Sequence, residues 1–189
     1  RYLHPLVAQQ LVDREGKLKR QKENYPHANH PVFRLVLGGE DIHLKRYPEL
    51  PGLELAAYWL NQLLVGEGSP PVTLAKLSYS QGDVEVIEPV LLSQTLFGQN
   101  LSDESAASPL LSQLDRAGFS AAFISTLLLN PDDAKPDNNL LAPYFTREGL
   151  YRYRFMSVDN DHILQEPLIK KGLLGKTELN VKSLLYCCD

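Results

Sequence analysis

Three polar side chains lie close together in a short stretch that cannot continue as a helix. Asp133, Lys135 and Asn138 stand at positions i, i+2 and i+5, and Pro136 stops a helix while it favours an extended backbone at Lys135. A carboxylate can orient or deprotonate a hydroxyl group, a cation can neutralise a phosphate, and an amide oxygen is a hard ligand for Mg²⁺. These residue types on one stiff loop therefore suit phosphoryl transfer.

The order Asp-x-Lys-Pro-x-Asn resembles the catalytic loop of the protein-kinase-like superfamily. The resemblance implies that Asp133 is the catalytic base, that Lys135 contacts the γ-phosphate and that Asn138 binds the metal. The alternative is a polar turn without chemistry, because Asn, Asp and Pro are ordinary turn residues. Other parts of the chain must therefore supply the remaining elements of a kinase.

A strand hairpin and a helix are predicted before the loop. Alternating residues over 32–37 and 41–46 flank the pair Gly38-Gly39, which is a hairpin turn signal, and Lys45 lies on the return strand. The spacing over 53–64 predicts a helix with one buried apolar stripe, formed by Leu53, Ala56, Ala57, Leu60, Leu63 and Leu64. In the kinase superfamily a strand lysine holds the α- and β-phosphates and pairs with a glutamate on the next helix, so the resemblance implies these roles for Lys45 and Glu54. Without the resemblance, Lys45 is an exposed charged residue on a strand, and Glu54 is an acidic residue in the first turn of a helix, where it suits the helix dipole.

The next strands lead to a predicted hinge. Residues 72–77 and 84–87 read as strands around the turn 80–83, and residues 89–95 read as the last strand of a small lobe. Kinases bind adenine against such a hinge, so the resemblance implies that Leu92, Ser93 and Gln94 contact the nucleotide. The linker 98–108 is rich in Ser, Asn and Asp and is the predicted domain boundary.

A helical region and a second hairpin surround the polar loop. Apolar residues recur at helical spacing over 109–129, with Gly118 as the expected break. After the loop, residues 140–158 predict a hairpin in which three aromatic residues alternate with Arg152 and Arg154. A basic and aromatic strip can also bind RNA, but the net charge of −4 and the hairpin context favour a strand with one packed and one solvated face.

Asp159 follows that hairpin directly. The kinase superfamily places the metal-binding Asp of its Asp-Phe-Gly motif at this point, and the resemblance implies that Asp159 binds the metal with Asn138. Here Asn160 and Asp161 replace the Phe and the Gly, so only the first residue of the motif matches. The alternative is a strand-end turn, which Asp-Asn pairs often form.

These elements predict an α+β protein with a two-lobed protein-kinase-like fold. An antiparallel sheet plus a helix would form the N-lobe (31–97), after an N-terminal helical and basic segment (1–30). A small, mostly helical C-lobe with a hairpin would follow (98–189), ending in a short helix over 178–185. The resemblance is closest to the phosphatidylinositol-kinase-like and bacterial toxin-kinase-like branches. Few residues follow Asp159 and the chain starts at Arg1, so we expect a minimal lobe or a fragment.

The predicted activity is an ATP- and Mg²⁺-dependent phosphotransferase acting on a protein or inositol-lipid hydroxyl, with a small-molecule acceptor also open. No Gly-rich phosphate loop precedes the strand at Val32, where Gly16 is the only glycine. Either a loop without glycine, over 24–30, covers the phosphates, or nucleotide binding is incomplete. The missing loop and the short carboxyl end favour, as an alternative within the same fold, a pseudokinase or interaction module. A third alternative is kinase-fold chemistry of another type, namely nucleotidyl transfer. A non-kinase α+β interaction domain is the alternative if no nucleotide binds.

Composition limits the partners and the compartment. The net charge of −4 argues against nucleic acid as a general partner, and no apolar run is long enough to span a bilayer. Cys187 and Cys188 are adjacent, which gives no disulfide framework and favours a reducing compartment. The expected location is therefore the cytoplasm, or a host cytosol if the protein is a bacterial effector. His27 and His30 are a weak candidate metal pair.

Overall fold

The computed structural model describes residues 31–132, 135–160, 162–171 and 175–181. Contacts divide this part of the chain into two compact units, the first with residues 31–51 and 71–95 and the second with residues 52–70 and 96–181. Antiparallel sheets and several helices make up the described residues, so the predicted α+β class is confirmed. The lobe ranges 31–97 and 98–189 stay predictions.

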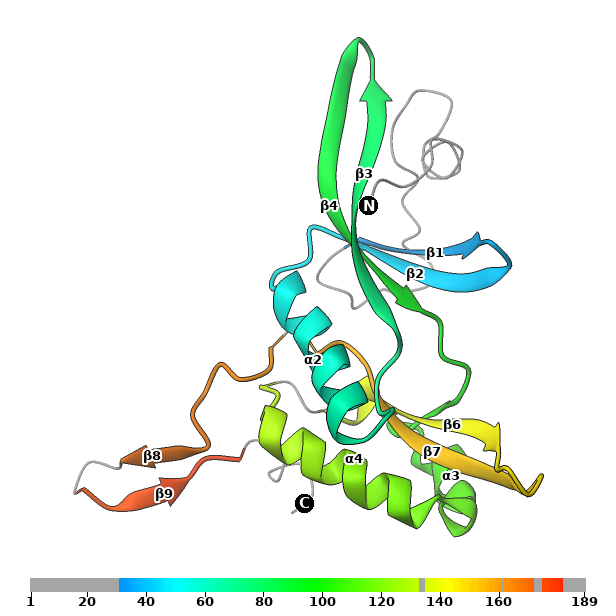
Figure 1. Ribbon diagram of the computed structural model, residues 1–189, viewed down its shortest axis with the longest axis vertical. Coiled ribbons are helices and arrows are strands. Elements are labelled where there is room, and N and C mark those ends of the chain that lie inside the picture. Colours follow the sequence, from blue (N-terminus) through cyan, green and yellow to red (C-terminus); the bar gives the residue numbers. More distant parts are fainter. Residues whose placement is uncertain (1–30, 133–134, 161, 172–174, 182–189) are drawn as a thin grey trace. The chain divides into compact units, whose positions relative to one another are not determined.

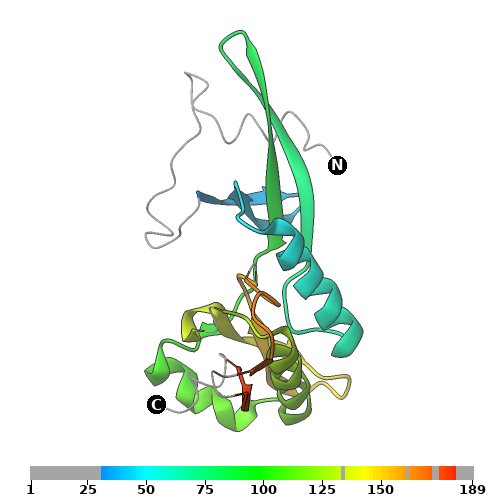
Figure 2. The same cartoon turned by 90° about the vertical axis from the view of Figure 1, so that its left-hand side faces the viewer.

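The first unit is a four-stranded antiparallel sheet in the order β1-β2-β4-β3 (Figure 1). Its strands are β1 (Val32–Leu37), β2 (Glu40–Arg46), β3 (Val72–Gln81) and β4 (Val84–Gln94). The predicted hairpin over 32–46 is confirmed, and both glycines of its turn have positive φ, as a primed turn requires. The segment 89–95 is mostly the second half of β4, so β3 and β4 form one long hairpin that extends past β1 and β2 (Figure 2).

One face of this sheet holds the core of the first unit. Phe33 lies opposite Leu44, and Leu44 lies opposite Leu92, so these side chains share a face. The buried cluster consists of Phe33, Leu35, Leu44, Ala75, Leu77 and Val90. Lys45 alternates with Leu44 and therefore lies on the other face, as the period-2 pattern predicts.

A buried ion pair belongs to the core face of the same sheet. Arg46 and Glu88 are 8% and 3% exposed, and their side chains meet through Nε with Oε1 and through Nη2 with Oε2 at 2.6 Å. Arg46 Nη2 also donates to the hydroxyl groups of Tyr47 at 3.0 Å and Tyr79 at 3.2 Å. Burial by itself would lower the pKa of Arg46, but the hydrogen bond and the charge of Glu88 raise it above its usual value. The guanidinium is therefore charged, and its Nε and Nη2 groups are held by Glu88 and the two tyrosines.

The second unit contains helices, one small sheet and a separate strand pair. Its helices are α2 (Pro51–Leu64), α3 (Glu104–Ala107) and α4 (Arg116–Leu129), with 3-10 turns η1 (Ser108–Gln113) and η2 (Pro136–Asn138). The sheet has the order β5-β6-β7, from β5 (Gln99–Asn100), β6 (Asn139–Phe145) and β7 (Tyr151–Ser157). β8 (Ile169–Lys171) pairs with β9 (Thr177–Leu179).

Two local predictions for this unit were wrong, and a third is confirmed only in part. α4 runs through Gly118 without a break, and the helical region is interrupted at Leu114 and Asp115 instead. The helix expected over 178–185 does not begin at Glu178, because Glu178 and Leu179 are part of β9; residues 182–185 lie outside the described residues. The apolar stripe expected on α2 is buried only in its first half, where Leu53, Ala57 and Leu60 belong to the core of the unit, whereas Leu63 and Leu64 are 81% and 51% exposed.

The buried face of α2 is instead partly polar. Ala57 packs with Leu129 and Ile163, and one turn later Asn61 is buried as well. The Asn61 side chain donates to Ser69 Oγ at 3.2 Å and accepts from Ser125 Oγ at 2.5 Å. Ser125 on α4 and Ser69 on the loop after α2 thus help to determine which face of α2 is buried. The spacing of hydrophobic residues alone does not reveal this.

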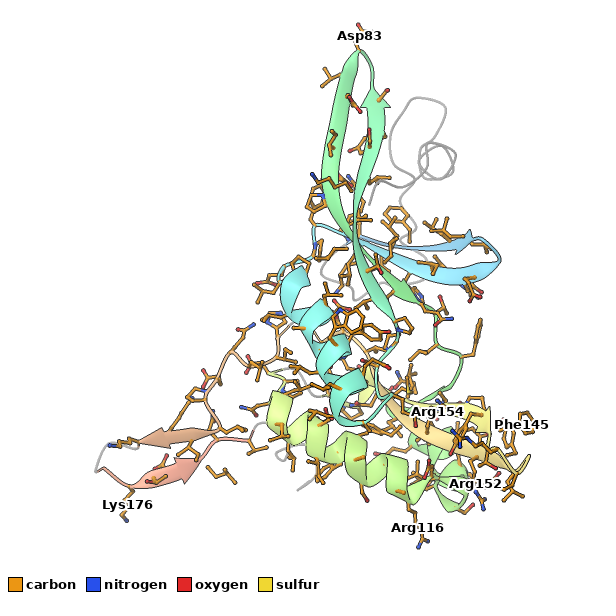
Figure 3. The ribbon with its side chains drawn as sticks, viewed as in Figure 1. Asp83, Arg116, Phe145, Arg152, Arg154 and Lys176 are labelled. Atoms are coloured by element: carbon orange, nitrogen blue, oxygen red, sulfur yellow. The ribbon has the colours of Figure 1, made fainter. Side chains whose placement is uncertain are left out.

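Asp115 explains where α4 begins. Its side chain accepts the backbone N–H of Gly118 at 3.1 Å, which is an N-cap, and the hydroxyl of Tyr144 on β6 at 2.8 Å. The Arg154 guanidinium on β7 lies 4.0 Å from the centre of the Tyr144 ring and pairs with Glu67 (Figure 3). This arginine of the basic and aromatic strip is therefore used within the unit.

Asp115 gives the second unit a pH-dependent stability. The hydrogen bond from Tyr144 and then that from Gly118 hold the pKa of Asp115 below its usual value. Its stabilising contribution is therefore full above the unfolded-state pKa of roughly 3.9 and is lost as the pH falls through the lower folded-state pKa. We expect Asp115→Ala to lower the free energy of unfolding by about 1–2 kcal/mol near neutral pH, and by less below about pH 4.

Urea titrations followed by circular dichroism at several pH values measure this difference. Asp115→Asn is the matched control, because asparagine keeps a capping oxygen but has no ionisable group. The difference in unfolding free energy between wild type and Asp115→Ala should become smaller as the pH falls. The difference between Asp115→Asn and Asp115→Ala should not change with pH. A constant difference from wild type down to about pH 2 would contradict the assigned role.

Candidate functional site

The hairpin β6–β7 brings Asn138 and the segment of Asp159 to the same end. Asn139 lies opposite Ser157 in the antiparallel register, so Asn138 lies beside Val158. The backbone N–H of Val158 donates to the carbonyl of Asn138 at 2.8 Å. Residues separated by about twenty positions in the sequence are therefore neighbours, and an amide and a carboxylate emerge from adjacent strand ends.

Asp159 adopts an unusual backbone conformation at this end. Its φ of 58° is in the left-handed region, where non-glycine residues are uncommon and Asn and Asp are the usual exceptions. The next residue, Asn160, is buried, and its side chain accepts from Ser157 Oγ at 3.0 Å and donates to the Ser157 carbonyl at 3.2 Å. Asn160 thus closes a turn that holds Asp159 exposed at its corner.

The part of the polar loop next to β6 is fixed by hydrogen bonds to its backbone carbonyl groups. Asn138 N–H donates to the carbonyl of Lys135 at 3.0 Å, and the Asn139 side chain donates to the same carbonyl at 3.0 Å. The Asn100 side chain on β5 donates to the Asp137 carbonyl at 2.7 Å. Asn138 is buried, while Lys135 is exposed. Asp133, the predicted base, lies outside the described residues.

The predicted phosphate and adenine residues belong to other elements. Lys45 lies on β2 of the first unit, and Glu54 is a buried residue of α2 in the second. Of the three hinge residues on β4, Leu92 packs against the core of the first unit and Gln94 donates to Glu40 Oε2 at 3.1 Å. Ser93 lies opposite His43 on β2. The roles assigned to these five residues stay predictions.

Two residues at the end of the hairpin carry ligand types that a hard cation takes. Asn138 has an amide oxygen and Asp159 a carboxylate, and Mg²⁺ binds both types. Among the described residues, which do not include Asp133 and Asp161, no group of three or more His, Cys, Asp or Glu side chains is arranged to hold a metal. A pocket of the second unit, lined in part by Asn61, Ser157 and Asn160, is too small for more than water.

Two asparagines have structural roles that the sequence did not single out. Asn160 closes the turn at Asp159, and Asn130 ends α4 in a left-handed conformation with its side chain in hydrogen bonds to later segments. The signal for Asn130 was available, because asparagine before proline after an apolar run is typical of a helix end. Nothing local signals its long-range partners.

A scan against protein-family models finds no match to this chain, and searches of curated proteins and of solved structures find no similar protein. In the part of the chain that the structure describes, no helix has both the length and the apolar character needed to cross a membrane.

Proposed function

We propose that this protein is an ATP- and Mg²⁺-dependent phosphotransferase with a two-lobed protein-kinase-like fold, acting on a protein or inositol-lipid hydroxyl. The observation that supports this most is the register of β6–β7, which sets Asn138 and the turn at Asp159 side by side. The sequence order of a polar loop, a hairpin and an acidic turn is therefore also a spatial neighbourhood.

Each predicted side chain has a distinct role in this proposal. Lys45, steadied by Glu54, would hold the phosphates of ATP, and Leu92, Ser93 and Gln94 would flank the adenine. Asn138 and Asp159 would hold Mg²⁺, which supplies charge neutralisation at the phosphates when it is bound. Asp133 would orient the acceptor hydroxyl and Lys135 would neutralise charge on the transferred phosphoryl group. The antiparallel sheet of the first unit is compatible with the sheet of an N-lobe, whereas α2, the helix assigned to that lobe, belongs almost entirely to the second unit.

A nucleotide titration tests this function. We expect wild type to bind ATP more tightly with Mg²⁺ than without it, and Asp159→Asn to lose about tenfold or more of the affinity for Mg²⁺–ATP, or roughly 1.4 kcal/mol. Isothermal titration calorimetry measures both affinities. Asp83→Asn removes the same charge from the exposed turn of the β3–β4 hairpin and is the matched control (Figure 3). No binding by wild type, or equal binding by both variants, would refute the proposal.

The second candidate keeps the fold without transferring phosphate. It is favoured by a sequence observation, which is the lack of a Gly-rich segment before β1 to cover the phosphates. In that case ATP would still stabilise the protein, but no phosphorylated product would form. If a product forms and carries a nucleotidyl group, its larger mass increase identifies the chemistry as adenylylation.

A further inference from the structure

Asn130 stands at the point where α4 turns into the polar loop. It is the C-cap of the helix, with φ 44° and ψ 60°, and its N–H donates to the carbonyl of Thr126 at 3.0 Å. Glycine and asparagine are the residues that adopt this conformation at least cost. The backbone conformation at this position is therefore also compatible with glycine. The presence of asparagine must be explained by its side chain.

The side chain of Asn130 joins two ends of a later segment. It is only 2% exposed, and its Nδ2 group donates to the carbonyl of Asn180 at 3.0 Å and to that of Glu166 at 3.3 Å. These two residues flank the strand pair β8–β9 on its two sides. A buried amide N–H group without a hydrogen-bond acceptor destabilises a protein, so the two hydrogen bonds hold this segment to the end of α4.

The strand pair is also closed on itself at its base. The backbone N–H of Asn180 donates to the Leu168 carbonyl at 2.7 Å, and its side chain donates to the Pro167 carbonyl at 3.1 Å and to Glu166 Oε2 at 3.3 Å. Glu166 also pairs with Lys170 on β8. Asn130 therefore contacts the two chain ends of a preassembled element, not two independent loops.

Backbone hydrogen bonds on either side of Asn130 extend the same junction. The N–H of Leu164 donates to the Leu129 carbonyl at 2.8 Å, and the N–H of Asp132 donates to the His162 carbonyl at 2.9 Å. Residues 129–132 thus run beside residues 162–164. The first stretch leads into the loop of Lys135 and Asn138, and the second follows Asp159 within a few residues.

We propose that Asn130 is a positioning residue, which fixes the loop of Lys135 relative to the chain that follows Asp159 by clamping both to the base of β8–β9. This rests on the proposed phosphotransferase function for its kinetic consequence. A displacement of about 1 Å in such a site can cost on the order of a hundredfold in rate. Residues on β2 and β4, assigned to ATP, are not part of the clamp, so the affinity for ATP should change little.

Two substitutions of Asn130 separate the side chain from the backbone. Asn130→Gly keeps the left-handed cap and removes the amide, whereas Asn130→Asp keeps the size and loses both N–H donors. In both variants we expect kcat to fall by about tenfold to a hundredfold, with KM for ATP within about threefold of wild type. A general loss of folding would not give this split, and circular dichroism confirms that the variants are folded.

Amide hydrogen exchange tests the clamp without any activity. The amides of Asp132, Leu164 and Asn180 should exchange at least about tenfold faster in both variants, while amides in the first two turns of α4 keep wild-type rates. Unchanged exchange at these three amides would overturn the clamp. Faster exchange with unchanged kcat would overturn the positioning role. If wild type transfers no phosphate, the proposed function fails, and the exchange rates still decide whether Asn130 holds the two segments together.

Discussion

Asp159→Ala is expected to lower the rate of phosphate transfer from ATP by about a hundredfold or more. Removal of a metal carboxylate takes away charge stabilisation that the transition state needs, a loss of several kcal/mol in enzymes of this kind. Asp133→Ala should cause a similar loss in rate for another reason, because the acceptor hydroxyl is no longer oriented or deprotonated. The two variants should differ in binding, since only Asp159→Ala weakens the affinity for Mg²⁺–ATP.

Transfer of radiolabelled γ-phosphate measures this effect. The acceptors are the protein itself, a mixture of proteins, and vesicles with inositol lipid, which together cover the proposed protein and lipid hydroxyl groups. Asp83→Ala, on the turn of the β3–β4 hairpin, is the control for the loss of one carboxylate. Full transfer by both Asp159→Ala and Asp133→Ala would end the assignment. Loss in Asp133→Ala alone would keep the loop and remove the metal role of Asp159.

The hairpins were predictable because their signals are local. Alternation over a few residues and a turn between them determine which side chains share a face, and β1–β2 and β6–β7 follow that pattern. The neighbourhood of Asn138 and Asp159 follows from it as well, since a hairpin between two polar turns must bring them together. This part of the candidate site could therefore be derived from the sequence.

The faces and breaks of the helices were not predictable in the same way. α2 buries Asn61 because Ser125, sixty-four positions later, offers it a hydroxyl, and Leu63 stays 81% exposed. α4 begins at Arg116, so Gly118 lies in its first turn, where the adjacent Asp115 caps the helix and Tyr144 on β6 holds the Asp115 carboxylate. Each helix thus depends on a polar contact from a distant element, Ser125 for α2 and Tyr144 for α4, that local propensity does not reveal. For the same reason, the local sequence does not predict the hydrogen bonds of Asn130 to the distant residues Glu166 and Asn180.

The buried ion pair of the first unit is expected to show the largest effect on stability. Glu88→Ala leaves the Arg46 guanidinium in a site where only 8% of the residue is exposed, with two tyrosine hydroxyl groups that cannot balance its charge. Breaking a buried pair by the removal of one partner costs about 3–5 kcal/mol. This is a large part of the stability of a small domain, which is roughly 5–15 kcal/mol in total.

Amide hydrogen exchange in the central strands measures this loss of stability in the first unit separately from the second. In Glu88→Ala, the amides of Leu44 and Val90 should exchange more than about a hundredfold faster, while those of α4 in the second unit provide the internal reference. Glu88→Gln keeps a hydrogen-bond acceptor and should lose less. Replacing both partners, as in Arg46→Met with Glu88→Leu, should restore most of the protection, because an apolar pair of similar size removes the unpaired charge. Equal exchange rates in Glu88→Ala and wild type would show that the ion pair contributes nothing to stability. If the double variant exchanges as fast as Glu88→Ala, the tyrosine contacts of Arg46 stabilise the sheet, and the charge balance does not.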